Sequence, residues 1–174
     1  MAQPRAIGVR LGYSIGVSYQ HQIGKKSMIQ TDIDFLRYGT WGAQGTVTFN
    51  WIVPLKSWEA VNWNLYAGIG IGGGYEWRFH TMDCSPRSCS SKWWGIGFAG
   101  VAAMIGLEWS FKIPLQFSIE YRPLISPCFA KNINYLFNNN LERTSVSFYR
   151  PGLWTSAAAV FVRYKFGGKS NKTL

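Results

Sequence analysis

Hydrophobic and polar residues alternate along most of this chain with a period of two. Between residues 158 and 166, for example, Val160, Val162 and Tyr164 alternate with Phe161 and Arg163. Residues 62–80 and 115–122 repeat the pattern. Strict alternation over such lengths predicts β-strands that have one apolar and one polar face.

Turn residues divide the alternating pattern into eight strands. The two longest connections, Phe79–Lys92 and Ser126–Pro151, fall at the same end. Both termini then fall at the other end, as in membrane barrels with short periplasmic turns and long extracellular loops. The predicted strands cover residues 5–12, 15–23, 28–38, 43–54, 62–78, 93–111, 115–125 and 152–166.

The glycine and aromatic positions indicate which face of the strands is buried in protein. Glycines at positions 68, 70, 72 and 74 lie on the polar face, where a narrow lumen needs thin walls. Aromatic residues gather at strand ends, as interfacial girdles do. A soluble lipocalin-type barrel would instead put the apolar face inside and leave many Trp and Tyr residues in water. We therefore predict an all-β fold, an eight-stranded antiparallel up-and-down transmembrane β-barrel.

Length and composition are compatible with this fold and disfavour membrane helices. The 174 residues suit one domain, with 47% apolar and 17% aromatic residues. The best candidate for a spanning helix, Trp93–Leu107, is 15 residues long and contains four glycines. A spanning helix needs about 20 apolar residues.

The formal net charge is +10, and its distribution along the chain argues against nucleic-acid binding. Inward-facing positions hold as many basic as acidic residues, whereas turns, loops and the tail supply the excess. Because an unpaired buried charge is costly, we predict a lumen ion-pair network in which Glu120 lies beside Arg163. Its members are Arg10, Asp32, Asp34, Glu76, Arg78, Glu108, Glu120, Arg122, Arg163 and Lys165.

Several segments resemble small outer-membrane β-barrel proteins of Gram-negative bacteria. They are residues 6–12, 62–68, 105–109, 118–123 and the ending Val162–Phe166. The resemblance covers about residues 5–166 and implies location in the outer membrane with both termini periplasmic. It also implies insertion by the outer-membrane assembly machinery through the strand that ends at Phe166. The chain departs from the family in that a short polar tail, residues 167–174, follows this Phe.

Proteins of this kind serve many roles, so the resemblance does not imply an activity. We expect a structural or surface-binding protein that acts through extracellular loops at about residues 79–92 and 126–151. The aromatic residues of the second loop favour a binding surface or a folded β-extension. Basic residues of these loops are expected to contact lipopolysaccharide phosphates or an acidic protein partner. They are Arg87, Lys92, Lys131, Arg143 and Arg150.

The sequence gives only weak indications of a catalytic or nucleotide-binding site. His80, Asp83 and Ser90 could supply a nucleophilic site, so an enzyme that modifies acyl chains of lipid A is an alternative, as is a narrow pore or a subunit of a larger complex. The G-x-G-x-x-G pattern at residues 68–73 continues as alternating strand, which argues against a nucleotide site. We expect no enzyme activity, cofactor or metal.

Three cysteines leave one question open. Cys84 and Cys89 bracket a short loop and could form a disulfide, whereas Cys128 has no nearby partner in sequence. Unpaired loop cysteines are the other reading.

Overall fold

The computed structural model describes residues 4–36, 40–57, 61–79, 83–85, 88–90, 92–136, 139–149 and 158–167, all as strand or connection. In chain order the strands are β1 (Arg5–Gly12), β2 (Ile15–Gln22), β3 (Ser27–Leu36), β4 (Thr40–Ser57), β5 (Val61–Phe79), β6 (Asp83–Ser85), β7 (Ser88–Ser90), β8 (Lys92–Phe111), β9 (Leu115–Tyr121), β10 (Leu124–Leu136), β11 (Asn139–Tyr149) and β12 (Ala158–Phe166). Within these ranges there is no helix long and apolar enough to span a membrane.

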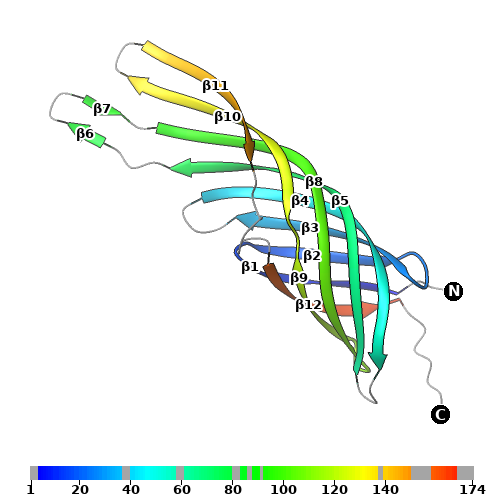
Figure 1. Cartoon of the computed structure of the whole chain (residues 1–174). Coiled ribbons are helices and arrows are strands. Elements are labelled where there is room, and N and C mark those ends of the chain that lie inside the picture. Colours follow the sequence, from blue (N-terminus) through cyan, green and yellow to red (C-terminus); the bar gives the residue numbers. More distant parts are fainter. Residues whose placement is uncertain are drawn as a thin grey trace.

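Eight strands form a closed antiparallel barrel. Neighbours in sequence pair from β1 through β5, β5 pairs with β8, and β8 pairs with β9. The ring closes because β12 pairs with β9 on one side and with β1 on the other. This confirms the predicted eight-stranded up-and-down barrel. The N- and C-terminal ends of the chain lie at the same end of it (Figure 1).

The seventh barrel strand is broken at Pro123 but keeps its register. Tyr121 pairs with Ile105 and Leu124 pairs with Ala102, so β9 and β10 meet β8 as one continuous strand. The Pro123 carbonyl still accepts a 3.0 Å hydrogen bond from the Ala103 amide. The interruption arises because proline has no N–H to donate.

The expected loop at residues 126–151 is largely a β-hairpin, which agrees with the folded β-extension that its aromatic residues favoured as one reading. Strands β10 and β11 pair from Ser126↔Tyr149 to Leu136↔Asn139, and β10 also pairs with β8 up to Asn134↔Lys92. Backbone hydrogen bonds to the long strand β8 hold this segment as a strand, although its Asn-rich sequence is typical of a loop. The expected loop at residues 79–92 contains the short β6–β7 hairpin.

Several strand ends also differ from the predicted bounds. Strand β4 continues past the expected end at Pro54 to Ser57, through a register shift between Pro54 and Lys56. A bulge at this point accommodates the missing proline amide. The last strand is described from Ala158, and residues 150–157 lie outside the described part of the chain.

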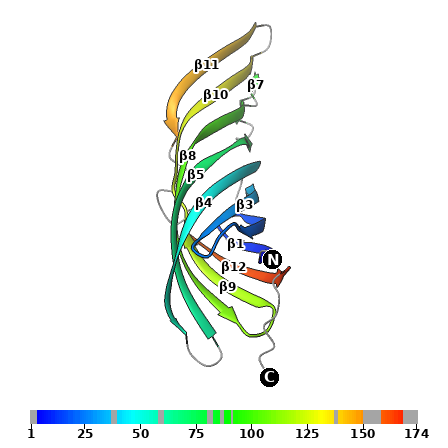
Figure 2. The same ribbon diagram turned by 90° about the vertical axis from the view of Figure 1, so that its right-hand side faces the viewer.

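One wall of the barrel is much taller than the opposite wall. Strands β1 and β2 have 8 residues each, whereas β5 and β8 have 19 and 20. The far ends of β5, β8, β10 and β11 therefore project beyond β1 and β2 as a curved sheet (Figures 1 and 2). We call residues 75–79, 92–98, 126–136 and 139–149 the projecting sheet.

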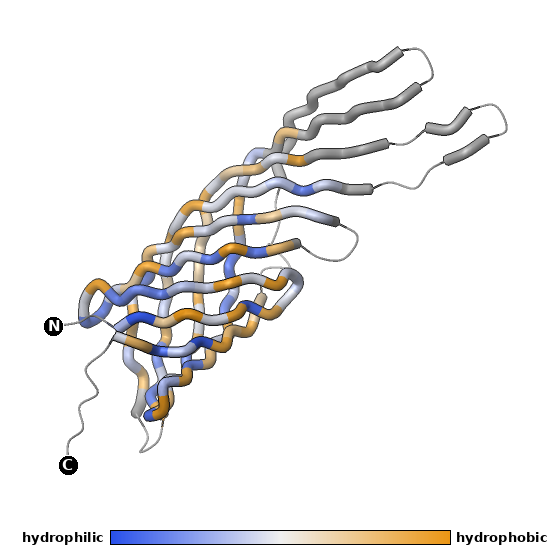
Figure 3. The backbone as a smooth tube through the Cα atoms, turned by 180° about the vertical axis from the view of Figure 1, so that it is seen from behind, coloured by the Kyte–Doolittle hydropathy of each residue, from blue (hydrophilic) through white to orange (hydrophobic). Residues whose placement is uncertain are grey.

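The barrel is apolar outside and polar inside. Along β4, Val47, Phe49 and Trp51 are exposed, whereas Thr48 and Asn50 between them are almost completely buried. Hydrophobic and hydrophilic positions alternate in this way along the barrel strands (Figure 3). Since side chains alternate between the two faces of a strand, the apolar face is the outer face and the polar face lines the lumen.

Candidate functional site

The centre of the lumen holds an ion pair between Glu120 and Arg163. Both side chains are 1% exposed, and Arg163 Nη2 lies 2.6 Å from Glu120 Oε1. Arg163 also donates to Ser118 Oγ at 2.6 Å and to Ser18 Oγ at 3.0 Å, and it lies over the Phe161 ring. The guanidinium is thus held by the charge of Glu120 and by neutral acceptors from β2 and β9.

Glu120 receives neutral donors as well. Tyr66 Oη donates a short hydrogen bond to Glu120, and Gln30 Nε2 donates to Glu120 Oε2 at 2.8 Å. Strands β3, β5, β9 and β12 therefore meet at one carboxylate in the middle of the barrel.

A second group of charges lies toward the projecting sheet. Arg122 pairs with Asp32 and, at 2.7 Å, with Asp34. Arg10 pairs with Asp34 at 3.2 Å and donates to Ser14 beside the β1–β2 turn. These two arginines and two aspartates neutralise one another, as a buried group of charges requires.

Amide side chains connect the central charges to the end of the barrel where the termini lie. Gln30 accepts from Gln20 at 2.9 Å, and Gln116 Nε2 lies 2.7 Å from both Gln20 Oε1 and Glu108 Oε2. Asn64 donates to Glu108 Oε1 at 3.2 Å. Polar side chains therefore form a hydrogen-bonded chain along the lumen from Ser14 to Glu108.

Glycines in the wall make room for this interior. A Cβ atom at Gly106 would come within 2.6 Å of the Tyr66 ring, and one at Gly74 would come within 2.9 Å of the Phe98 ring. Phe98 belongs to a buried apolar layer with Ile96, Ala102 and Leu124 beyond the charged centre. The inward-facing glycines thus leave space for large side chains from the neighbouring strands.

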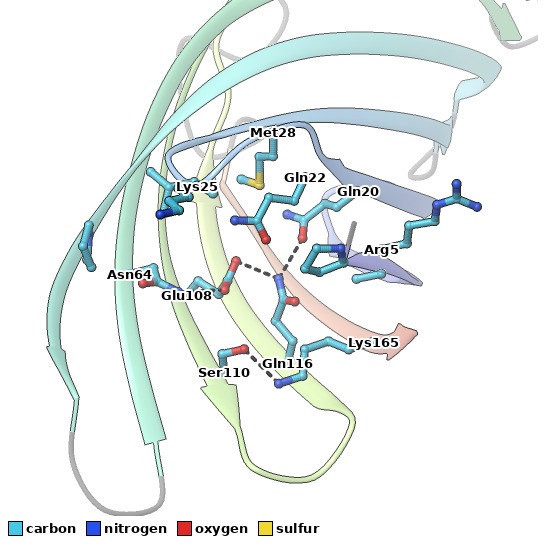
Figure 4. A pocket seen from close by; sticks show the side chains of 14 residues that line it. Arg5, Gln20, Gln22, Lys25, Met28, Asn64, Glu108, Ser110, Gln116 and Lys165 are labelled. Atoms are coloured by element: carbon cyan, nitrogen blue, oxygen red, sulfur yellow. Dashed lines mark hydrogen bonds between the residues drawn. The ribbon is translucent and has the colours of Figure 1, made fainter. Parts of the chain in front are cut away.

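A cavity of about 370 Å³, lined by polar and apolar side chains, opens the lumen at the end where the termini lie. We call it the lower cup. Figure 4 shows Gln116 reaching both Gln20 and Glu108 inside it, and Lys165 reaching Ser110. The lining residues are Pro4, Arg5, Ala6, Gln20, Gln22, Lys25, Met28, Ile52, Pro54, Asn64, Glu108, Ser110, Gln116 and Lys165.

The structure brings most of the predicted network together. Six members are linked by ion pairs: Arg10, Asp32, Asp34, Glu120, Arg122 and Arg163. Glu108 and Lys165 line the lower cup, where the hydrogen bonds described above join them to neutral groups. Glu76 is buried, and the side chain of Arg78 lies outside the described residues.

The sequence-based prediction of the network did not include its neutral members. Gln20, Gln30, Gln116 and Tyr66 carry no charge, so a search for balancing charges passes over them. Their inward parity on alternating strands was the signal that could have found them.

For most of the residues predicted at the rim, the structure describes the backbone but not the side chain. Lys92, Lys131 and Arg143 belong to β8, β10 and β11, whereas Arg87 and Arg150 lie outside the described residues. The predicted contacts of all five basic residues with phosphates or a partner stay predictions.

Two of the cysteines and two of the alternative catalytic residues belong to the β6–β7 hairpin, whereas Cys128 belongs to β10. Cys84 is the register partner of Cys89, and Asp83 that of Ser90. Their side chains and His80 lie outside what the structure describes, so the disulfide and the alternative nucleophilic site stay predictions. Among the described residues, no group of three or more His, Cys, Asp or Glu side chains could hold a metal ion.

Comparison with known proteins identified no relative of this chain. No protein-family model, curated protein or solved structure matches this chain.

Proposed function

We propose that this chain is an integral β-barrel of a Gram-negative outer membrane, with a closed lumen and no catalytic role. It acts as a structural or surface-binding protein through its projecting sheet. The observation that carries the proposal is the inverted barrel: apolar side chains cover the outside, and charged side chains fill the inside. In water, so large an apolar surface would cause aggregation, whereas in lipid it is the stable arrangement.

Aromatic pairs on the outer wall support a membrane position. Trp63 contacts Trp109 with ring centres 5.3 Å apart, and Tyr75 contacts Trp77 at 4.8 Å where the projecting sheet begins. Residues 64–74 lie between these pairs on β5, a stretch close to the roughly 9–11 residues of a membrane-spanning β-strand. Aromatic girdles at both interfaces would bound the apolar band in this way.

The lumen supports a closed barrel. An eight-stranded barrel has an interior just wide enough for its side chains. Here the Arg163–Glu120 pair, the Arg122–Asp32 pair and the apolar layer around Phe98 occupy successive levels of it.

We therefore expect no stepwise conductance when the purified chain is inserted into planar lipid bilayers at neutral pH. The measurement is single-channel current, with insertion verified by resistance to extraction and with detergent-only additions as the control. Reproducible ohmic steps of uniform size would contradict the closed lumen and favour the pore alternative.

The projecting sheet supports surface binding. Strand β11 is the last strand of the sheet and, among the described residues, pairs only with β10. Such a strand offers unpaired backbone groups to a partner. Exposed Phe129 on the neighbouring strand β10 provides apolar contact area beside it. The two predicted loop segments carry Arg87, Lys92, Lys131, Arg143 and Arg150 against Asp83 and Glu142, which favours an anionic partner or lipid phosphates.

Reversing two of these charges tests the surface role. We expect the double variant Arg143→Glu and Arg150→Glu to retain about tenfold less lipopolysaccharide or acidic partner at low salt, with a smaller difference at high salt. Retention is measured by co-purification and titration. The control, Lys26→Glu with Lys112→Glu, makes the same charge change in turns at the opposite end of the barrel. Equal retention by the rim variant and the wild type at low salt would contradict the proposed role.

A further inference from the structure

The lower cup has the size and the lining of a ligand site. Its volume of about 370 Å³ equals that of roughly 12 water molecules. A closed lumen requires only that the charged centre of the barrel be filled by side chains. The open cavity at this end therefore has no role in closing the lumen.

The only acidic side chain that lines the cup already has its hydrogen-bond partners there. Glu108 Oε1 accepts from Asn64 and Oε2 accepts from Gln116, so neutral amides surround this carboxylate. It is 8% exposed and lies at the inner side of the cup. An entering cation would have to compete with these bonds, which disfavours a cationic ligand.

The cationic side chains of the cup keep donors for a ligand. Lys165 Nζ donates to Ser110 Oγ at 3.0 Å and to the Phe111 carbonyl at 2.6 Å, which leaves one of its three protons. Lys25 is exposed in the β2–β3 turn and lines the cup, and Arg5 lies at its edge. In Figure 4, Lys25 and Lys165 lie on either side of the Gln116–Glu108 pair. Three cations and one carboxylate give the lining a positive balance.

We propose that the lower cup binds a small polyanion through Lys25 and Lys165, with carboxylate or phosphate groups as the recognised chemistry. Gln22 and Asn64, which also line the cup, supply amide groups that can bind the uncharged part of such a ligand. The site goes beyond the proposed surface role. It depends on the lumen geometry alone.

The test is a titration of the full chain refolded in zwitterionic detergent micelles. Citrate and inorganic phosphate are added separately, with ionic strength kept constant by sodium chloride. The readout is the nuclear magnetic resonance of the side-chain amides of Gln20, Gln22, Asn64 and Gln116. We expect saturable shifts of these signals with at least one of the two anions. Shifts with citrate alone indicate carboxylate recognition, and shifts with phosphate alone indicate phosphate recognition.

The variants Lys25→Met and Lys165→Met are expected to raise the Kd by about tenfold each, the loss of one charge-assisted hydrogen bond. Lys26→Met is the matched control, because Lys26 is exposed in the same turn but does not line the cup. Should Lys165→Met fail to fold, Lys25→Met carries the test, since its side chain is exposed. Absence of saturable shifts with both anions, or an equal loss in Lys26→Met, would overturn the proposal. Neither outcome depends on bilayer conductance or on partner retention at the rim.

Discussion

Replacing Glu120 with Ala is expected to lower the free energy of unfolding by about 3–5 kcal/mol, because it leaves a buried arginine without its counter-charge. Glu120 is the one carboxylate within 2.6 Å of Arg163 among the described residues, and it also accepts from Tyr66 and Gln30. The measurement is the urea midpoint of reversible unfolding in lipid or detergent, followed by Trp fluorescence.

Two further variants make this result specific. Removing both charges, with Glu120→Ala and Arg163→Met together, should restore much of the stability, since no uncompensated charge remains. Ile119→Ala alters the neighbouring outward residue, which is exposed, and should cost much less. An unchanged midpoint for Glu120→Ala alone would mean that water solvates Arg163 and that the lumen is wet.

The second large effect is expected at a glycine in the wall. Gly8 is the register partner of Arg163, and a Cβ atom there would collide with the Val162 carbonyl oxygen and lie 2.6 Å from Arg163 Cα. These are backbone atoms of the paired strand, so no side-chain rotation can relieve the overlap. We expect Gly8→Ala to lower the unfolding free energy by about 3 kcal/mol, the upper part of the usual range for overpacking.

Gly45→Ala is the matched control for this prediction. A Cβ atom at Gly45 would meet no heavy atom within 4 Å, so the change should stay within about 0.5 kcal/mol. Both variants are compared by the same urea midpoint. If the Gly8→Ala and Gly45→Ala variants were equally stable, the close approach of neighbouring strands could not be the reason why the inward positions hold glycine.

The alternation of residues predicted the barrel well because it is a local signal. Strand β1 begins and ends where the pattern predicted, at Arg5 and Gly12, and the inward parity of Glu120 and Arg163 follows from the same period of two. Their mutual contact also followed from the order of the strands, since the last strand of an up-and-down barrel must lie beside the seventh.

The bounds of the hairpin β10–β11 and its pairing with β8 could not be predicted in the same way. Its residues include the run Asn138–Asn140, which is typical of a loop, and its pairing with β8 joins positions far apart in sequence. The lower cup is likewise a product of tertiary structure. Its lining comes from β1, β2, β3, β4, β5, β8, β9, β12 and the β2–β3 turn, and a cavity between strands leaves no periodic mark in the sequence.

The proposed function requires that the outer face of this barrel contact lipid while its polar face contacts protein. It is tested most directly by nitroxide labels at single cysteines in positions 46–51 of β4, after Cys84, Cys89 and Cys128 are replaced by Ser. In lipid bilayers, we expect high collision rates with oxygen and low rates with a water-soluble nickel reagent at Val47, Phe49 and Trp51, and low rates with both at Thr46, Thr48 and Asn50. High rates with the nickel reagent at Val47, Phe49 and Trp51, or rates without a period of two, would contradict the proposed function.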